Sequence, residues 1–256
     1  MILRQSTTLR LLVACAALVT VAPAAAGHVT WAAVATAAEN RGRKSPYADL
    51  DPALRQVLEK FDTAQAGVTA LSARFTERKH LGLLKNDVIQ QGRFYHTKPD
   101  KFLWEYSTPE PKVLLMTGSS LVAYYPRQKQ AEEIRTRLSR RLIKYFGIGQ
   151  VFSDLQEYYK LSIDPANEIA GTHLIIMKPK QRRLEKRVTE LRLWLDDRLN
   201  QIRQLEYREA DGDRTLFVFE EIEVNPAISP ARYTLELPND VKVSDTFSGF
   251  FSQKGR

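Results

Sequence analysis

The sequence predicts a mainly β (α+β) protein, a single domain formed by an incomplete antiparallel β-barrel of about 11 strands, with a short helical lid and an N-terminal helix. Three observations support this prediction. From Leu71 onward, apolar residues recur at every second position, and the segments are separated by short turns. The run breaks once, near residues 138–158, where the spacing becomes helical. A sheet of so many strands curls or closes rather than staying flat.

Residues 1–26 are predicted to be a secretory signal peptide. Arg4 and Arg10 precede the apolar run "LLVACAALVTVA", and small residues at Ala24 and Ala26 form a cleavage pattern. The apolar run is shorter than the roughly 20 residues that a spanning helix needs. "LVAC" at residues 12–15 resembles a lipoprotein box, but the segment between Arg10 and Cys15 is too short for the usual apolar region. We therefore expect cleavage after Ala26, with a second small-residue site at Thr36 to Ala38 and lipidation of Cys15 as the alternatives.

The rest of the chain divides into a flexible leader (27–46), one main domain (47–245) and a C-terminal tail (246–256). The domain opens with a helix, because Asp51 is a good N-cap, Pro52 suits the first helical position and Gly67 ends the apolar stripe. Asp211-Gly212 predicts a hairpin turn. The alternation in "ARYTLELP" (231–238) predicts another strand, and "PNDVKVSD" predicts a short last one.

No catalytic residue, metal site or cofactor is predicted. The only cysteine, Cys15, lies in the signal peptide. The four histidines lack metal-ligand spacing, and we expect His80 and His96 to lie at the surface of their strands. No serine stands in a nucleophile motif. We therefore expect a protein that is not an enzyme.

The chain is basic, with a formal net charge of +8, which often indicates nucleic-acid binding. Export argues against that partner and favours anionic lipid or an acidic protein. Two basic runs, Arg135–Arg141 and Lys178–Arg187, are either solvated faces or a docking patch for such a partner.

The segment "YHTKPDKFLWEYSTP" places Phe102, Trp104 and Tyr106 at alternate positions of one predicted strand. Alternate residues share a face of a strand, so the three rings form one wall. The wall is either ordinary core or the lining of an apolar cavity.

Four segments together resemble the outer-membrane lipoprotein carrier proteins, the LolA family. They are "LSARFTERK", "GRFYHTKPDKFLWEYSTPEPKVLLMTGSSLVAYYPRQKQ", "DRLNQIRQLEYREADGDRTLFVFEEIEVNP" and "YTLELPNDVKV". The resemblance runs from about Leu71 to Asp245, and its most specific part begins at Gly92. It implies a half-open β-barrel with a helical lid over an apolar cavity.

The resemblance also implies site residues. Phe102 and Trp104 correspond to cavity residues, and Lys98 falls where well-known members carry an arginine that holds the lid closed. Lysine lacks the planar fork of arginine, so we expect a weaker lock. The expected cavity wall comprises Phe75, Phe94, Phe102, Trp104, Tyr106, Val113, Leu115 and Tyr124. The expected lid residues are Leu142, Tyr145 and Phe146.

We accordingly expect a monomeric periplasmic carrier that moves an acylated lipoprotein or related lipid from the inner to the outer membrane. Its partners would be the cargo, an inner-membrane lipoprotein-releasing transporter and an outer-membrane receptor, with no nucleic acid. The alternative is a membrane-anchored, LolB-like receptor or a lipid-sensing protein on the same fold.

Overall fold

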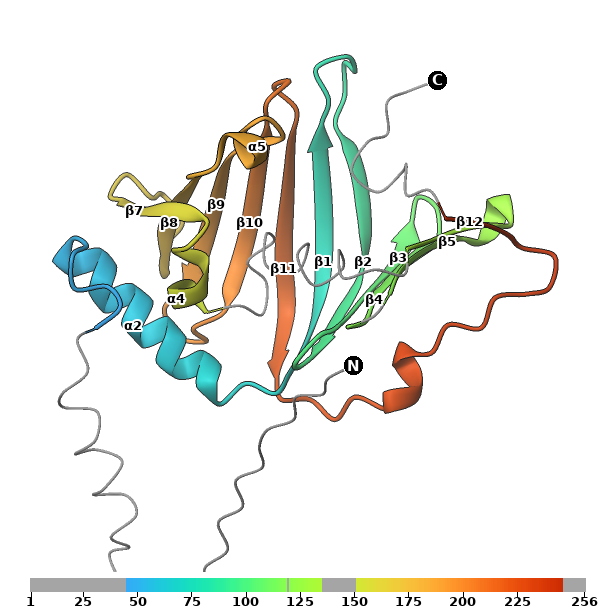
Figure 1. Ribbon diagram of the computed structural model, residues 1–256, viewed down its shortest axis with the longest axis horizontal. Helices are drawn as coiled ribbons and strands as arrows, with labels where there is room; N and C mark the ends of the chain where they lie inside the picture. The colour runs from blue at the N-terminus through green and yellow to red at the C-terminus, as the bar shows by residue number, and fades with distance from the viewer. Residues whose placement is uncertain (1–44, 119, 135–150, 246–256) are drawn as a thin grey trace, which may run out of the picture. The chain divides into compact units, whose positions relative to one another are not determined.

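The computed structural model describes residues 45–118, 120–134 and 151–245 (Figure 1). The predicted signal peptide, nearly all of the leader and the tail lie outside these residues. The predicted lid residues Leu142, Tyr145 and Phe146 also lie outside them, as does the basic run Arg135–Arg141.

One twelve-stranded sheet dominates the described residues, close to the roughly 11 strands that the sequence predicts. The first half contains β1 (Ala70–His80), β2 (Val88–Thr97), β3 (Lys101–Thr108), β4 (Lys112–Met116), β5 (Leu121–Tyr125) and β6 (Gln130–Ile134). The second half contains β7 (Tyr159–Asp164), β8 (Thr172–Pro179), β9 (Val188–Asp196), β10 (Ile202–Glu209) and β11 (Arg214–Val224), and β12 (Lys242–Ser244) comes last.

The sheet consists of two meanders joined at β1 and β11. Its order is β12-β6-β5-β4-β3-β2-β1-β11-β10-β9-β8-β7, so β12 and β7 are its two edges (Figure 1). Neighbouring strands are antiparallel except for β12, which pairs parallel with β6. The short helices are α4 (Phe152–Leu155) and α5 (Arg182–Glu185), with 3₁₀ turns η2 (Pro126–Gln128) and η3 (Pro230–Tyr233).

The first described helix, α2 (Pro52–Ala66), begins as predicted. The Asp51 carboxylate accepts hydrogen bonds from the backbone N–H groups of Ala53 and Leu54, and Gly67 is the C-cap. Its apolar stripe, with Leu58 at its centre, is buried in the main core. Asp62 of α2 accepts hydrogen bonds from the N–H groups of Phe152 and Ser153, which fixes the start of α4 on α2.

Ring contacts identify the inner side of the curled sheet. Strands β3 and β11 are separated by β2 and β1, a distance of about 14 Å in a flat sheet. Nevertheless, the Trp104 ring on β3 lies 5.1 Å from that of Phe217 and 6.0 Å from that of Phe219, both on β11. Side chains converge in this way only on the concave side of a curl. We call this side the inner face and the opposite side the outer face.

The predicted strand over 231–238 is wrong. This part of the chain forms η3 and then runs across the sheet without pairing. Tyr233 is buried against Leu103 and Leu115, with Ile228 and Leu235 packed beside them. These two leucines lie on the outer face, because Leu103 and Leu115 alternate with Trp104 and Leu114 of the main core. We call residues 226–238 the strap. The strap is an extended chain that lies on an apolar surface. Its side chains alternate between the surface and solvent with a period of two residues, as they would in a strand.

Candidate functional site

An aromatic wall covers the inner face in the middle of the sheet. Phe75, on β1, is fully buried, and its ring lies 4.9 Å from those of both Trp104 and Tyr106 in edge-on contacts. Phe94, on β2, stands directly opposite Trp104, with the two rings 4.5 Å apart. Edge-on and tilted ring pairs stabilise such a cluster through their quadrupoles and through burial. The wall is therefore continuous across β1, β2 and β3.

Gly92 allows this wall to close. It lies between β1 and β3, opposite Phe75 and Tyr106. A Cβ atom at this position would lie 2.1 Å from the Glu105 carbonyl oxygen and 2.9 Å from the Phe75 ring. The register of β2 against β3 shifts at Gly92, which brings the Glu105 carbonyl close to it. Only glycine, which has no Cβ atom, leaves room for both this carbonyl and the Phe75 ring.

The structure brings together five of the eight predicted wall residues, namely Phe75, Phe94, Phe102, Trp104 and Tyr106. The other three predictions are wrong in orientation. Val113 and Leu115 pack in the outer-face cluster beneath the strap, and Tyr124 pairs directly with Val113, so it shares that face. The error is a shift of one residue in β4, which moves every side chain to the other face.

Sequence reasoning missed several inner-face residues. On β4 and β5 these are Leu114, Met116, Leu121 and Ala123, and on β11 they are Phe217 and Phe219. The two phenylalanines could have been found, because "TLFVFEE" places them at alternate positions like those of β3. No such signal exists in "KVLLM", where apolar residues occupy both faces.

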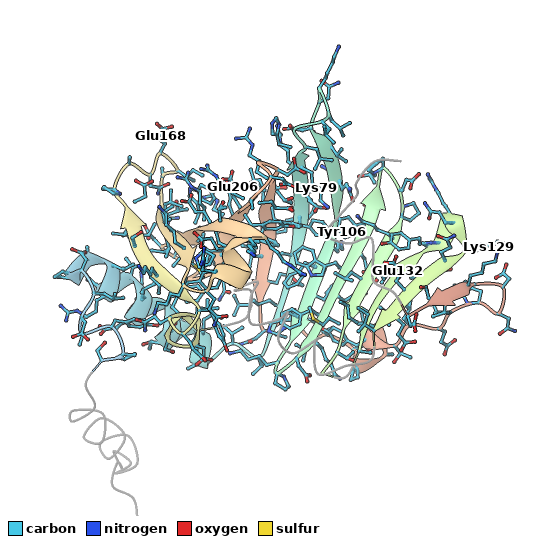
Figure 2. The ribbon with its side chains drawn as sticks, turned by 45° about the horizontal axis from the view of Figure 1, so that its top comes forward. Lys79, Tyr106, Lys129, Glu132, Glu168 and Glu206 are labelled. Atoms are coloured by element: carbon cyan, nitrogen blue, oxygen red, sulfur yellow. The ribbon has the colours of Figure 1, made fainter. Side chains whose placement is uncertain are left out.

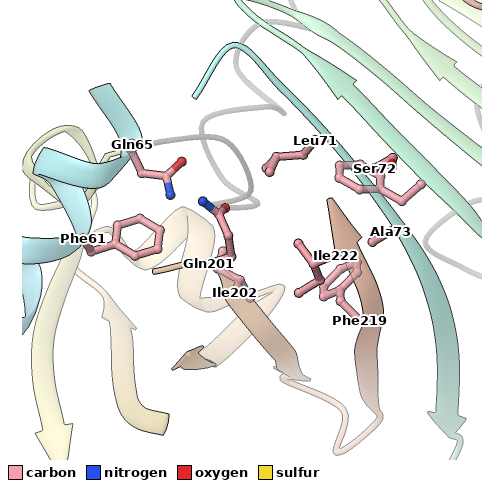
Figure 3. Close-up of a pocket in the computed structure, with 10 residues that line it drawn as sticks. Phe61, Gln65, Leu71, Ser72, Ala73, Gln201, Ile202, Phe219 and Ile222 are labelled. Atoms are coloured by element: carbon pink, nitrogen blue, oxygen red, sulfur yellow. The ribbon is translucent and has the colours of Figure 1, made fainter. Parts of the chain in front are cut away.

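A pocket lies where the end of α2 meets the inner face (Figure 3). Its volume is about 400 Å³, which includes its solvent-open mouth. Phe61 and Gln65 line it from α2, and Gln201 faces them from the turn before β10. The remaining walls are the largely apolar Leu71, Ser72, Ala73, Phe94, Ile202, Phe219 and Ile222. The pocket continues the aromatic wall, because it shares Phe94 and the neighbouring Phe219 with it.

Lys98 lies beside this pocket rather than in a described lid. Its Nζ donates a hydrogen bond to the backbone carbonyl of Gln65 over 2.6 Å, near the C-terminal end of α2. A cation there satisfies a helix carbonyl and complements the negative end of the helix dipole. The predicted partner, the lid, lies outside the described residues, so the lock stays a prediction.

His96 is fully buried, and its expected surface position is wrong. The ring stacks on Phe102 with 4.1 Å between centroids, and Nδ1 lies 3.0 Å from the Lys101 carbonyl oxygen. Nδ1 therefore carries the proton and donates it, while Nε2 is buried without a hydrogen-bond partner. Burial lowers the pKa of His96 to about 4, so the ring is neutral at ordinary pH.

The described residues contain no group of three or more His, Cys, Asp or Glu side chains that could hold a metal ion. None of their helices has the length and apolar character required to cross a membrane.

Comparison with known proteins places this architecture in a family. Residues 66–236 match the family described as outer membrane lipoprotein carrier protein LolA. An outer-membrane lipoprotein carrier protein of Cupriavidus pinatubonensis is 22% identical over 201 residues, covering 77% of this chain and 91% of that protein. One from Alkalilimnicola ehrlichii is 24% identical over 188 residues, covering 71% and 80%.

The solved structures that match this chain are more distant in sequence. An uncharacterised conserved protein of Thermus thermophilus has 10% identity and a TM-score of 0.49, covering 75% of this chain and 98% of that one. A LolA superfamily protein of Nitrosomonas europaea has 12% identity and a TM-score of 0.38, covering 71% and 97%. The family match spans β1 to β11, including the aromatic wall, and the chain therefore belongs to the LolA family of outer membrane lipoprotein carrier proteins.

Proposed function

We propose that this protein is a periplasmic carrier that holds the acyl chains of a lipoprotein, or of a related lipid, against the aromatic inner face. The observation that carries the proposal is the continuity of the aromatic wall with the pocket beneath α2. Names of the relatives support the same class of cargo. The predicted signal peptide supports the compartment, and the proposal does not involve catalysis.

The energetics of acyl chains require such a cavity. Each acyl CH₂ group exposed to water costs about 0.8 kcal/mol, so a multiply acylated cargo cannot cross an aqueous space unprotected. Much of the pocket's roughly 400 Å³ is open solvent at its mouth, so the enclosed part is too small to hold several acyl chains. Entry of several chains therefore requires the rings of the wall to separate. Ring-to-ring contacts suit this movement, because acyl chains replace one apolar neighbour with another.

The decisive experiment measures release of newly made lipoproteins from spheroplasts by the purified mature protein. We expect release by the wild type and by Trp104→Phe, which keeps an aromatic ring on the inner face. Trp104→Glu should release no more than buffer, because a carboxylate on the wall repels apolar chains. Circular dichroism must show that this variant is folded. Release by a folded Trp104→Glu at the wild-type level would contradict the proposal.

The transporter that donates the cargo and the receptor that accepts it belong to the same proposal. A closable cavity that works without ATP needs an affinity for cargo between those of donor and acceptor. Transfer between purified membrane fractions, with and without this protein, measures both steps.

One observation favours a second candidate role. In this role the protein acts as a receptor that delivers its cargo directly at a membrane surface. At the tip of the β1–β2 hairpin, Leu83 is 94% exposed and Leu84 is 48% exposed, and Lys85 follows them. Gly82 at this tip donates a backbone hydrogen bond to Asp213 of the β10–β11 turn, which holds the tip in place. Exposed leucines beside a basic residue suit the interface of an anionic bilayer.

Flotation with vesicles containing phosphatidylglycerol separates the two roles. Binding by the wild type that is lost in Leu83→Glu/Leu84→Glu supports delivery at the membrane itself. No binding by the wild type supports the soluble shuttle and excludes the second role.

A further inference from the structure

A belt of polar side chains crosses the inner face, and Lys79 and Tyr106 of this belt are labelled in Figure 2. Glu77 follows Phe75 by two residues on β1, and Lys79 follows by two more, so all three share the inner face. On the flanking strands, Gln90 stands opposite Glu77, and Thr215 stands opposite Lys79. We call this row the polar belt, and it crosses β4, β3, β2, β1, β11 and β10. Its members are Lys112, Tyr106, Gln90, Glu77, Lys79, Thr215 and Tyr207.

The polar belt is closed on itself, because its charged groups contact one another. The Glu77 side chain is only 1% exposed, and its Oε1 lies 3.2 Å from Lys79 Nζ. The Tyr106 hydroxyl donates a hydrogen bond to the same carboxylate, and burial together with the charge of Glu77 raises the pKa of Tyr106 well above its usual value. Lys112 Nζ lies 4.1 Å from the centre of the Tyr106 ring. Separating a buried ion pair leaves an uncompensated charge, so these contacts resist opening.

The aromatic wall lies between the polar belt and the pocket. Leu71 lines the pocket and Glu77 belongs to the belt, and the strand between these two positions is about 20 Å long. Strand β11 has the same order, because Phe219 lines the pocket, Phe217 packs against the wall and Thr215 belongs to the belt. One acyl chain of a membrane lipid spans about half of the roughly 30 Å hydrocarbon core of a bilayer. The apolar stretch is therefore long enough for one such chain.

We propose that the polar belt sets the longest acyl chain that this protein accommodates. The chain enters at the solvent-open mouth of the pocket and extends along the aromatic wall as the rings separate. It stops at the belt, because an apolar chain end offers no hydrogen bond in place of those that it would break. The inference rests on the proposed function, since it specifies which acyl chains the carrier holds.

The test is a series of monoacyl phosphatidylcholines with lauroyl, myristoyl, palmitoyl, stearoyl and arachidoyl chains, each kept below its micelle concentration. Displacement of a fluorescent fatty-acid probe from the purified protein gives each affinity. Every added pair of CH₂ groups that enters an apolar site should tighten binding about fifteenfold. We expect this gain up to the palmitoyl chain. From stearoyl to arachidoyl it should fall below about threefold, because the added groups stay in water.

The variant Glu77→Leu/Lys79→Met/Tyr106→Phe replaces the linked groups with apolar side chains of similar size, a change that buried ion pairs often tolerate. In this triple variant, the gain from stearoyl to arachidoyl should return to about fifteenfold. The double variant Glu77→Leu/Lys79→Met keeps Tyr106 and should change the series in the same direction. It replaces the triple variant if circular dichroism shows that the triple variant is unfolded.

The matched control is Glu206→Leu/Arg208→Met. This pair has the same signs of charge, with Arg208 Nε 2.7 Å from Glu206 Oε1, but it lies on the outer face. Its removal should leave the series as in wild type.

An undiminished gain through the arachidoyl chain in wild type would overturn the inference, whether or not a variant folds, and would leave the carrier function standing. So would a folded belt variant whose gain stops at the same chain length as that of wild type. Failure of wild type to bind any member of the series would overturn both the inference and the proposed function.

Discussion

The two faces of β3 are buried in different ways. On the inner face, Trp104 and Tyr106 are enclosed by rings from other strands, with the 4.9 Å contacts to Phe75 as the centre. On the outer face, Leu103 is covered by the strap of the same chain. The strap also makes directional contacts. The Tyr233 and Thr97 hydroxyls are 2.7 Å apart, and Arg232 Nη1 lies 2.9 Å from Glu105 Oε2.

The inner face of β3 is therefore buried by contacts that a ligand can replace, and its outer face by contacts that are specific to the strap. Ring contacts have no strict partner, so they can be exchanged for contacts with a ligand at little cost. The hydrogen bond and the ion pair of the strap form only with specific partners, so they hold the strap in one position on the outer face. One strand therefore carries a surface suited to opening and a surface suited to staying closed. Four predictions test this contrast, from the largest expected effect to the smallest.

The first prediction concerns the centre of the aromatic wall. Phe75→Ala should lower the free energy of unfolding by about 3–5 kcal/mol, because it leaves a cavity at a fully buried position touching Trp104 and Tyr106. Urea denaturation followed by tryptophan fluorescence measures the loss. Phe75→Leu leaves a smaller cavity, so it should lower the free energy of unfolding by less than Phe75→Ala does. A loss below about 1 kcal/mol for the alanine variant would mean that the wall is loosely packed.

The second prediction concerns His96 and pH. Its pKa is about 4 in the folded protein against 6.5 for the free side chain, so the unfolded state binds more protons between these values. Stability is therefore full above pH 6.5 and falls as the pH decreases toward 4, by up to about 3 kcal/mol from this group.

The variant His96→Phe keeps the ring stacked on Phe102 and should flatten the pH dependence in this window. His80→Asn is the control, since His80 is partly exposed and lies 3.0 Å from Asp87. Urea midpoints at pH 7 and pH 5 give the comparison. An identical pH dependence in wild type and His96→Phe would show that His96 is not protonated on unfolding in this range.

The third prediction concerns the strap. Tyr233→Phe removes the hydroxyl that bonds to Thr97 and should cost about 1 kcal/mol in the free energy of unfolding. Affinity for an acyl ligand should not change, because Tyr233 lies on the outer face. A change in affinity comparable to that of Trp104→Glu would mean that the two faces are coupled.

The smallest effect is expected from Arg232→Ala. Its guanidinium pairs with Glu105 and lies 4.2 Å from the centre of the Tyr95 ring, but both ionic side chains are about 40% exposed. Solvent screens such pairs, so the loss should stay below about 1 kcal/mol and shrink further in high salt. A loss as large as that of Phe75→Ala would remove the contrast between the faces.

Most of the architecture could be predicted from local patterns. The Asp51 cap, the Asp211-Gly212 turn and the sequential hairpins depend on neighbouring residues, and the structure confirms all of them. Trp104 could be assigned to one face because Phe102, Trp104 and Tyr106 are aromatic at alternate positions, even though Leu103 on the other face is also buried. An aromatic repeat was thus sufficient to mark the inner face of β3.

The misassigned residues share a physical cause. Leu115 and Val113 belong to a strand covered on both sides, inside by rings and outside by the strap, so the periodicity that marks a face is missing. Tyr233 was assigned to a strand because the strap alternates like one. His96 was placed at the surface on residue type alone, while its burial depends on stacking against Phe102. The correct assignment in each case depends on a packing partner in another segment, which the local periodicity does not reveal.

The path of the strap has a mechanical consequence. It leaves the central strand β11, crosses the outer face and ends in β12, which is paired with β6 near the far edge of the sheet (Figure 1). Lys129 of the β5–β6 turn fastens this end, through an ion pair with Asp240 and a backbone bond to Lys242. A tighter curl would lengthen the route around the outside, and a segment of fixed length resists that. The strap thus acts as an external brace that limits how tightly the sheet can curl.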